Sequence, residues 1–284
     1  DKDLRTLPVS ILDDLQPVDI EEYLSVLTYY EKDGQIYQNH EEGKARKLAT
    51  LNTFFGYFHK KEMIQKNAPS VVDVPRVKEK NIIRLDANEV AQLIDNIESG
   101  EKLTKQQKVW HERNKARDLA IVVTLLGTGV RVTELVGLDL SDLDFDNGAM
   151  RVIRKGGNED IVYFGEETEE MLRNYLDERM KMTPAPGHEN ALFISQNNTR
   201  ITVRSVERLV KKYASTATVK KITPHKLRST YGTALYQETG DIYLVADVLG
   251  HKNVNTTRKH YAAMKEENKR KAANIVQLRE SKGN

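Results

Sequence analysis

The segment from Thr223 to Gly250 carries start and stop signals for two consecutive helices, and no other feature constrains the fold as strongly. Thr223 precedes Pro224, the usual order of an N-cap residue and a proline at the first helical position. Gly240 suits the left-handed residue that ends a helix, Asp241 suits the N-cap of the next helix, and Gly250 suits its end. The segment therefore predicts helices over 224–239 and 241–249.

The rest of the chain predicts a mainly α fold with a small β-hairpin. Apolar residues at helical spacing predict further helices at 18–30, 44–59, 87–97, 117–126 (ending at Gly127), 168–182, 202–214 and 255–264. Two strand-like runs, 150–154 and 161–164, flank the sequence KGGNED, which suits a tight turn. The polar segment 31–43 predicts a long loop.

The length of 284 residues exceeds what one small domain usually needs. Residues 69–83 contain two prolines and little periodicity, which is typical of a linker between domains. We expect a helical domain at 1–68, a second domain at 84–265, and a C-terminal helix or tail at 266–284. The first domain has only two or three expected helices, so we expect it to be truncated at its N-terminus.

Several functional classes find no support in the sequence. The chain has no cysteine, which excludes disulfides, thiolate catalysis and cysteine-ligated zinc. No run approaches the ~20 apolar residues of a membrane span, and the chain starts with charged residues instead of an apolar signal segment. A Walker loop, a dinucleotide fingerprint and an HExxH helix are also absent. We expect a cytoplasmic protein without a metal, a cofactor or a membrane partner.

The net charge of +2 hides an asymmetry along the chain. Residues 200–284 contain 18 Lys and Arg against 7 Asp and Glu, a net charge of +11, and the remainder has a net charge of −9. A basic C-terminal portion suits an anionic polymer such as DNA. Charged helix faces that point into solvent would explain the same counts.

A set of cations near expected helix starts, together with one tyrosine, carries the possible chemistry. Each is weak evidence alone, because exposed arginines, turn lysines and packing tyrosines are common. His225 and Arg228 lie three residues apart, so both project from one helix face. The whole set is Arg131, Lys155, His225, Arg228, His251 and Tyr261.

Taken in order, five motifs resemble the catalytic domain of the tyrosine recombinases. They are TGVRVTEL, the lysine of RKGGN, HKLRSTYG, LGHKNVNTTRKHY and its terminal tyrosine. The resemblance covers about residues 84–265, and the upstream helical part is similar to the family's core-binding domain. It therefore implies a two-domain protein with a mostly helical, mixed α/β catalytic domain.

The resemblance assigns a role to each candidate residue. It implies that Arg131 and Arg228 are the catalytic arginines, Lys155 the hairpin lysine, His225 and His251 the active-site histidines, Glu134 a supporting acid, and Tyr261 the nucleophile. Ten residues separate His251 from Tyr261, which is one more than the usual family spacing.

The family's chemistry suits these residue types. The tyrosine hydroxyl attacks a DNA phosphodiester, forms a 3′-phosphotyrosine link and expels a 5′-hydroxyl, so resealing needs neither ATP nor metal. Two arginines supply forked, permanently charged donors to the phosphate oxygens. We expect His225 to act as the base, His251 to donate to the phosphate, and Lys155 to protonate the leaving oxygen.

Within the family, the segment 31–43, KGGNEDIVYFG and LGHKNVNTTRKHYAAM are most similar to the single-protein Xer recombinases of the XerS class. This similarity implies resolution of chromosome dimers at a specific duplex DNA site by a homotetramer, with a DNA translocase as a possible activator. An integrase or transposase of a mobile element would share the same catalytic residues. A non-catalytic DNA-binding protein and a helical interaction protein are alternatives from other classes.

Two basic helix faces are candidate readers of the DNA, although base identity depends on groove geometry. They comprise Lys44, Arg46, Lys47, Arg204, Arg208, Lys211 and Lys212. The apolar stripe at 272–276 suggests that the C-terminal helix docks on a neighbouring protomer.

Overall fold

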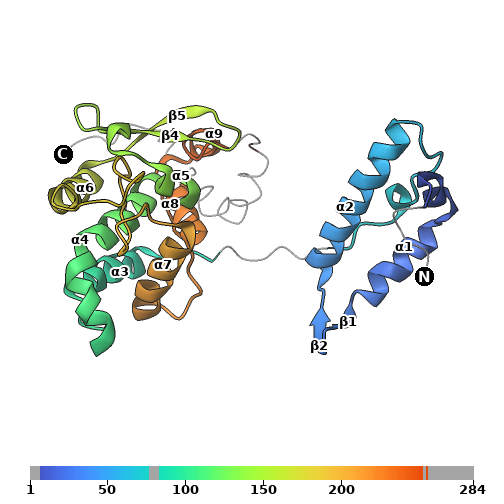
Figure 1. Ribbon diagram of the computed structural model, residues 1–284, viewed down its shortest axis with the longest axis horizontal. Helices are drawn as coiled ribbons and strands as arrows, with labels where there is room; N and C mark the ends of the chain where they lie inside the picture. The colour runs from blue at the N-terminus through green and yellow to red at the C-terminus, as the bar shows by residue number, and fades with distance from the viewer. Residues whose placement is uncertain (1–6, 77–82, 252–253, 255–284) are drawn as a thin grey trace, which may run out of the picture. The chain divides into compact units, whose positions relative to one another are not determined.

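The structure is a computed structural model that describes residues 7–76, 83–251 and 254. The chain divides into two compact units, Asp1–Asn81 and Ile82–Asn284 (Figure 1). The division falls inside the proline-containing segment 69–83. Each unit has its own buried core, so each is described separately.

The first unit is built on two helices and a hairpin. Its elements are η2 (Val9–Asp14), α1 (Pro17–Val26), β1 (Tyr29–Lys32), β2 (Gln35–Gln38), α2 (Glu41–Lys60) and η3 (Ala68–Val71). Ile20 and Leu24 of α1 pack with Leu48 of α2 and with Ala68 in a small core. These buried positions follow the helical spacing that predicted both helices.

The expected long loop at 31–43 is wrong, and so is the expected end of the first helix at residue 30. Strands β1 and β2 pair antiparallel there, and Tyr30 stacks on its cross-strand partner Tyr37 at 5.4 Å between ring centroids. Asp33 and Gly34 form the turn with positive φ values of 53° and 72°. Asp-Gly is a strong hairpin signal, but the exposed, polar strands beside it lack the alternation that marks a half-buried strand.

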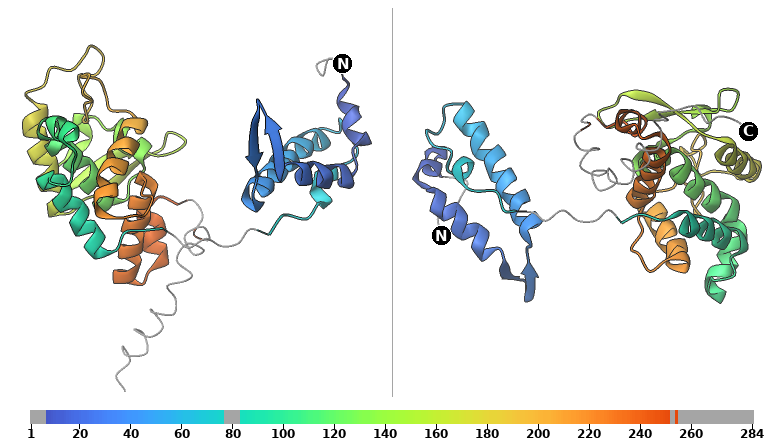
Figure 2. Two further views of the ribbon diagram at one scale, coloured as in Figure 1. Left: turned by 90° about the horizontal axis from the view of Figure 1, so that it is seen from below. Right: turned by 180° about the vertical axis from the view of Figure 1, so that it is seen from behind.

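The second unit is mostly helical with one small antiparallel sheet of order β3-β4-β5 (Figures 1 and 2). This arrangement confirms the expected fold class. The elements in chain order are α3 (Ala87–Ser99), α4 (Lys105–Thr128), α5 (Val132–Gly137), η4 (Leu140–Asp142), β3 (Leu143–Asp144), β4 (Ala149–Ile153), β5 (Glu159–Tyr163), α6 (Glu166–Arg179), α7 (Val203–Ala217), α8 (Pro224–Thr239) and α9 (Ile242–Val248).

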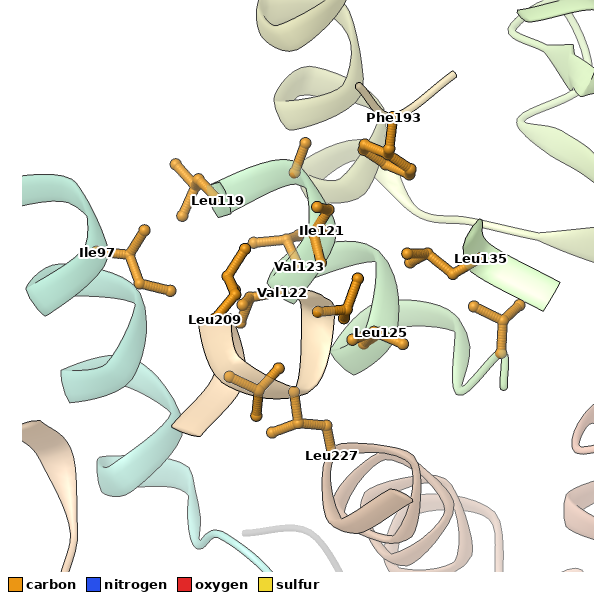
Figure 3. Close-up of a cluster of buried hydrophobic side chains, with 14 of the residues drawn as sticks. Ile97, Leu119, Ile121, Val122, Val123, Leu125, Leu135, Phe193, Leu209 and Leu227 are labelled. Carbon is orange, nitrogen blue, oxygen red and sulfur yellow. The ribbon is translucent and has the colours of Figure 1, made fainter. Parts of the chain in front are cut away.

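Helix α4 forms the centre of this unit. Its residues 119–125 are all buried, which is typical of a helix surrounded by other elements. Figure 3 shows Ile121, Val122 and Leu125 of α4 among side chains from α5, α7 and α8. Fully burying one such side chain stabilises the fold by about 1.5–3 kcal/mol. The core therefore holds the C-terminal end of α4 beside α5 and α8.

The capping signals of the two final described helices are confirmed. Helix α8 spans 224–239 as expected and ends at Gly240, whose φ is 66°. The Asp241 carboxylate caps α9 by accepting bonds from the backbone N–H groups of Tyr243 (2.8 Å) and Leu244 (3.1 Å). The expected helix at 255–264 lies outside the described residues.

The expected limits of α4 are wrong at both ends. The helix begins at Lys105, where Thr104 and Gln107 form a capping box, and it ends at Gly129 instead of Gly127. Its first half is highly charged, which hides the apolar periodicity. Gly127 is helical and packs against α6: a Cβ atom there would lie 2.4 Å from Oγ1 of Thr168. Strand β3, only two residues long, was also not expected.

Across the described ranges, no helix combines the length and the apolar character that crossing a membrane requires.

Candidate active site

Two of the candidate cations, Arg131 and Arg228, meet at the C-terminal end of α9, together with Arg154. Carbonyl groups at a helix end lack intrahelical partners and carry partial negative charge, so they attract cations. Three successive carbonyls here accept hydrogen bonds from three arginines of different elements: Arg154 donates to Val248 (3.3 Å), Arg228 to Leu249, and Arg131 to Gly250 (3.1 Å). We call these three side chains the arginine cluster.

Arg131 occupies the N-cap position of α5 and binds Glu134, three residues later. Its guanidinium Nη1 donates to Oε1 of Glu134 at 2.7 Å, and its backbone N–H donates to Oε2 at 2.8 Å. The Arg131 side chain is 33% exposed, whereas that of Glu134 is 2% exposed. One edge of the arginine is therefore fixed while part of its surface stays accessible to a ligand.

Glu134 is a buried carboxylate between two arginines, because Nη1 of Arg154 donates to its Oε2 at 3.1 Å. Burial alone would raise the pKa of Glu134. The hydrogen bonds from Arg131 and the positive charges of Arg154 and Arg131 outweigh that effect and hold the pKa below its ordinary value. Glu134 is therefore ionised and joins the two arginines through charge-assisted hydrogen bonds.

Arg228 lies on α8 with a buried side chain. Its Nη1 donates to the carbonyl of Gly129 at 2.5 Å, and its Nη2 donates to that of Leu249. Gly129 ends α4 with a φ of 64°, and a Cβ atom there would lie 2.5 Å from the Tyr231 ring. The close approach and the positive φ both require glycine. Arg228 thus binds the ends of two helices, α4 and α9.

The two candidate histidines lie close in the sequence to parts of this arrangement. His225 is on α8, three residues before Arg228, and is exposed. His251 is half-buried and directly follows Gly250, and its backbone N–H donates to the carbonyl of Ala246 at 2.9 Å. The backbone at His251 is therefore held by α9 and by the arginine cluster.

Lys155 lies in the turn between β4 and β5 and is exposed. Main-chain bonds close this turn: the N–H of Arg154 donates to Asn158 (2.7 Å), and the N–H of Gly157 donates to Arg154 (3.0 Å). The strand register confirms the expected hairpin. Strands β4 and β5 pair antiparallel, from Ile153 opposite Glu159 next to the turn to Ala149 opposite Tyr163. Tyr261, the expected nucleophile, lies outside the described residues.

Arg154 was not among the expected site residues. Its side chain is only 11% exposed and contacts Glu134, Asp160 and Val248, which belong to three different elements. Its place next to Lys155 in RKGGN was the one available signal. Apart from that place, its sequence surroundings resemble those of Arg151 on β4, because both precede glycines and acidic residues of the hairpin.

The expected DNA readers on α7 separate into two kinds. Arg204, Arg208 and Lys211 are exposed. Lys212 instead forms an ion pair with the buried Asp118 (3.2 Å), and its Nζ lies 3.8 Å from the Tyr213 ring centroid. Lys212 is thus part of the packing between α7 and α4.

The α2 face shows a similar difference. Lys44 pairs with Glu41 at 2.6 Å and its side chain is 17% exposed. Arg46 is exposed and Lys47 is half-buried. Among these three, Arg46 presents its charge most openly to a ligand.

As for metals, the described part of the chain contains no group of three or more His, Asp and Glu side chains that could hold an ion.

Forked cations gathered on a helical domain with a small sheet have the chemistry that binds a phosphate or phosphodiester group. The chain belongs to the phage integrase family, whose model matches residues 83–268. It is accordingly a tyrosine recombinase, an enzyme class that cleaves and rejoins DNA strands.

Its relatives include Xer recombinases. The chain is 33% identical over 223 residues to tyrosine recombinase XerC of Corynebacterium glutamicum, covering 77% of the chain and 68% of the relative. It is 39% identical over 184 residues to tyrosine recombinase XerS of Streptococcus agalactiae, covering 64% of the chain and 51% of the relative. The match thus spans about half the length of XerS.

Solved structures of the same fold include two further Xer proteins. The crystal structure of XerA recombinase matches with a TM-score of 0.56 and 26% identity, covering 94% of this chain and 86% of that one. XerH bound to a palindromic difH substrate matches with a TM-score of 0.68, covering 93% of this chain and 73% of that one. Because the identity to XerH is only 23%, this match supports a shared fold and nothing further.

Proposed function

We propose that the chain is a Xer-type recombinase that resolves chromosome dimers by cutting and rejoining DNA at a specific site, with Tyr261 as the nucleophile. One observation carries this proposal: Arg131 and Arg228 are fixed on successive carbonyls directly before His251. Three of the expected catalytic residues, which are far apart in the sequence, meet at one helix end. A protein that only grips DNA has no need of such an ordered set.

The arginines stabilise the charge that builds on the non-bridging phosphate oxygens during attack. Their contacts with backbone carbonyls and with Glu134 hold them before the substrate arrives, so little reorganisation accompanies the reaction. A preorganised donor of this kind contributes about 3–4 kcal/mol by analogy with an oxyanion-hole donor. Arg131 meets the phosphate with its accessible edge, while Arg228 contributes from a buried position.

The remaining residues move protons. The Tyr261 oxygen forms a bond to phosphorus as its proton passes to His225, because a phenol with a pKa near ~10 needs a base at neutral pH. The bond between phosphorus and the 5′-oxygen breaks, and Lys155 gives that oxygen a proton. His251 donates a hydrogen bond to the phosphate. The reverse steps rejoin the strand, because the phosphotyrosine link keeps the energy of the broken bond.

The partner is duplex DNA that carries the recombination site, and four protomers hold two sites together. Arg46 on α2 and Arg204, Arg208 and Lys211 on α7 contact its backbone or bases, since their side chains are exposed. A DNA translocase activates the complex, and the apolar stripe at 272–276, which lies outside the described residues, docks on the neighbouring protomer. The enzyme works on the chromosome in the cytoplasm.

The similarity to XerC and XerS supports the chromosomal role over that of a mobile-element integrase. The test is a plasmid that carries two directly repeated copies of the host's chromosomal resolution site. Incubation with the protein and the activating translocase should convert it into two smaller circles, and a plasmid with only one copy is the control. Recombination at the ends of a mobile element but not at the chromosomal site would favour the integrase. DNA binding without any recombination would overturn the proposal.

A further inference from the structure

We infer that Arg154 is a positioning residue that joins the Lys155 turn to Glu134 and to the end of α9. The inference rests on the proposed catalytic roles of Lys155 and Arg131. Arg154 lies one residue before Lys155, so any displacement of its backbone moves the lysine. Its side chain reaches the same carboxylate that holds Arg131.

The guanidinium of Arg154 donates from each of its three nitrogens to a different element. Nε donates to Asp160 on β5 (2.9 Å), Nη1 to Glu134 on α5 (3.1 Å), and Nη2 to the Val248 carbonyl of α9 (3.3 Å). A planar fork satisfies three acceptors in fixed directions, which a lysine ammonium on a flexible stem does less well. The contacts therefore fix the position of the hairpin base relative to α5 and α9.

The end of α9 is shaped to receive this side chain. Gly250 has a φ of 58°, and a Cβ atom there would lie 2.8 Å from Cζ and 2.9 Å from Nε of Arg154. The guanidinium thus packs against bare backbone at the residue that directly precedes His251. Any side chain at position 250 would displace it.

The main chain of Arg154 closes the turn that carries Lys155. Its N–H donates to Asn158, and its carbonyl accepts from Gly157. Arg154 therefore acts at both levels: its backbone forms the turn, and its side chain binds the turn to the arginine cluster. Loss of the guanidinium would leave the strand pairing intact but release the Lys155 turn from its attachment to α5 and α9.

Arg151 on the adjoining strand β4 provides a matched control. It also forms two ion pairs, with Asp142 of η4 (2.6 Å) and Glu159 of β5 (2.9 Å), but its side chain is 45% exposed. Its ion pairs reach neither Glu134 nor α9. A merely structural role in holding the sheet would be shared by both arginines, whereas positioning of Lys155 belongs to Arg154 alone.

The first experiment compares cleavage of two nicked duplexes, one with a normal 5′-oxygen leaving group and one with sulfur in its place. Sulfur leaves without protonation, so it bypasses the general acid. Arg154→Ala should slow cleavage of the oxygen substrate by about 100-fold, the lower range for loss of a general acid, and cleavage of the sulfur substrate much less. Lys155→Ala serves as the reference, and Arg151→Ala should behave like wild type on both substrates.

Equal loss on both substrates, or a match between Arg154→Ala and Arg151→Ala, would overturn the inference. Arg154→Lys keeps the charge next to Glu134 and guards against misfolding of the alanine variant. It should fall between wild type and Arg154→Ala on the oxygen substrate, since it keeps one contact of three. Folding of each variant is checked by its thermal unfolding transition.

A second experiment needs no DNA. Amide hydrogen exchange at Gly157, whose N–H is bonded to Arg154, and at His251 should be faster in Arg154→Ala than in wild type and unchanged in Arg151→Ala. Unchanged exchange in Arg154→Ala would overturn the inference even if the wild-type protein cleaves DNA. Absence of cleavage by the wild type, with faster exchange in the variant, would overturn the proposed function and leave the positioning role supported.

Discussion

Arg131 binds Glu134 twice, through its backbone N–H and through its guanidinium. The first bond caps α5 and the second sets the direction of the side chain. An arginine at a helix N-terminus faces the positive end of the helix dipole, which disfavours it unless an acid compensates. Glu134 supplies that charge, so the capping of a short helix and the placement of Arg131, the proposed catalytic arginine, depend on one carboxylate.

Replacing Glu134 should destabilise the second unit. Glu134→Gln leaves Arg131 and Arg154 close together without a negative charge between them. Breaking a buried pair in this way costs about 3–5 kcal/mol. Urea unfolding at pH 7 measures the loss. The control is Glu169→Gln, which breaks an exposed pair with Arg173 and should cost less than about 1 kcal/mol. Similar losses in the two variants would contradict the role of Glu134.

The difference in stability between wild type and Glu134→Gln should depend on pH. The pKa of Glu134 is lower in the folded protein than its ordinary value of 4.5. The stability that its ionised form contributes is therefore present in full above about pH 4.5 and is lost as the pH falls through the lowered folded pKa. The advantage of wild type over Glu134→Gln should shrink over that acidic range. A constant difference down to low pH would contradict this linkage.

Two glycines with similar positive φ values allow backbone strain to be distinguished from side-chain contact. Gly240 and Gly250 have φ values of 66° and 58°. A Cβ atom at position 240 would have no neighbour within 4 Å, whereas one at 250 would meet Arg154. Gly240→Ala should cost about 1–2 kcal/mol from the left-handed conformation alone. Gly250→Ala should cost more and also slow DNA cleavage. Equal effects on stability and full cleavage activity in both variants would contradict the proposed packing.

The α7 cations should respond differently to substitution. Arg208 is exposed, so Arg208→Ala should weaken DNA binding and reduce the slope of affinity against salt by about one phosphate contact, with unchanged stability. Lys212→Ala should instead destabilise the fold, because the buried Asp118 carboxylate loses the positive charge of its ion-pair partner. Salt titrations of binding and urea unfolding measure the two effects. If Lys212→Ala lost much of its affinity for DNA without losing stability, Lys212 would have to be a DNA-contacting residue after all.

The C-terminal segment should matter more for assembly than for binding. Residues 265–284 carry a short apolar stripe at 272–276 on a charged background. Deleting them should impair the pairing of two DNA sites more strongly than the binding of one site. Native gels with one-site and two-site DNA measure both. Equal losses would count against docking on a neighbouring protomer.

Much of the fold could be predicted because its signals are local. Helix α8 has a proline at its first turn and a glycine at its end, and both act within a few residues. The β1–β2 hairpin was missed although Asp33 and Gly34 form its turn, because its strands bury almost nothing and show no alternation. The start of α4 was missed because exposed charged residues carry little periodicity.

The family motifs predicted most residues of the candidate site, but they did not predict Arg154. Arg131, Arg228 and Lys155 each stand in a short motif of the sequence. Arg154 acquires its role from Glu134 and Val248, which lie 20 and 94 residues away in the chain. Such contacts exist only after the hairpin, α5 and α9 have packed together. Local spacing therefore cannot distinguish Arg154 from Arg151.

The most direct test of the central claim is a covalent adduct between Tyr261 and DNA. The substrate is a duplex of the recombination site with a nick near the cleavage position, which prevents religation and traps the intermediate. Denaturing gel electrophoresis should show a protein–DNA adduct with the native chain and none with Tyr261→Phe, while both bind the duplex on a native gel. An adduct that persists in Tyr261→Phe, or binding by the native chain without any adduct, would contradict the account.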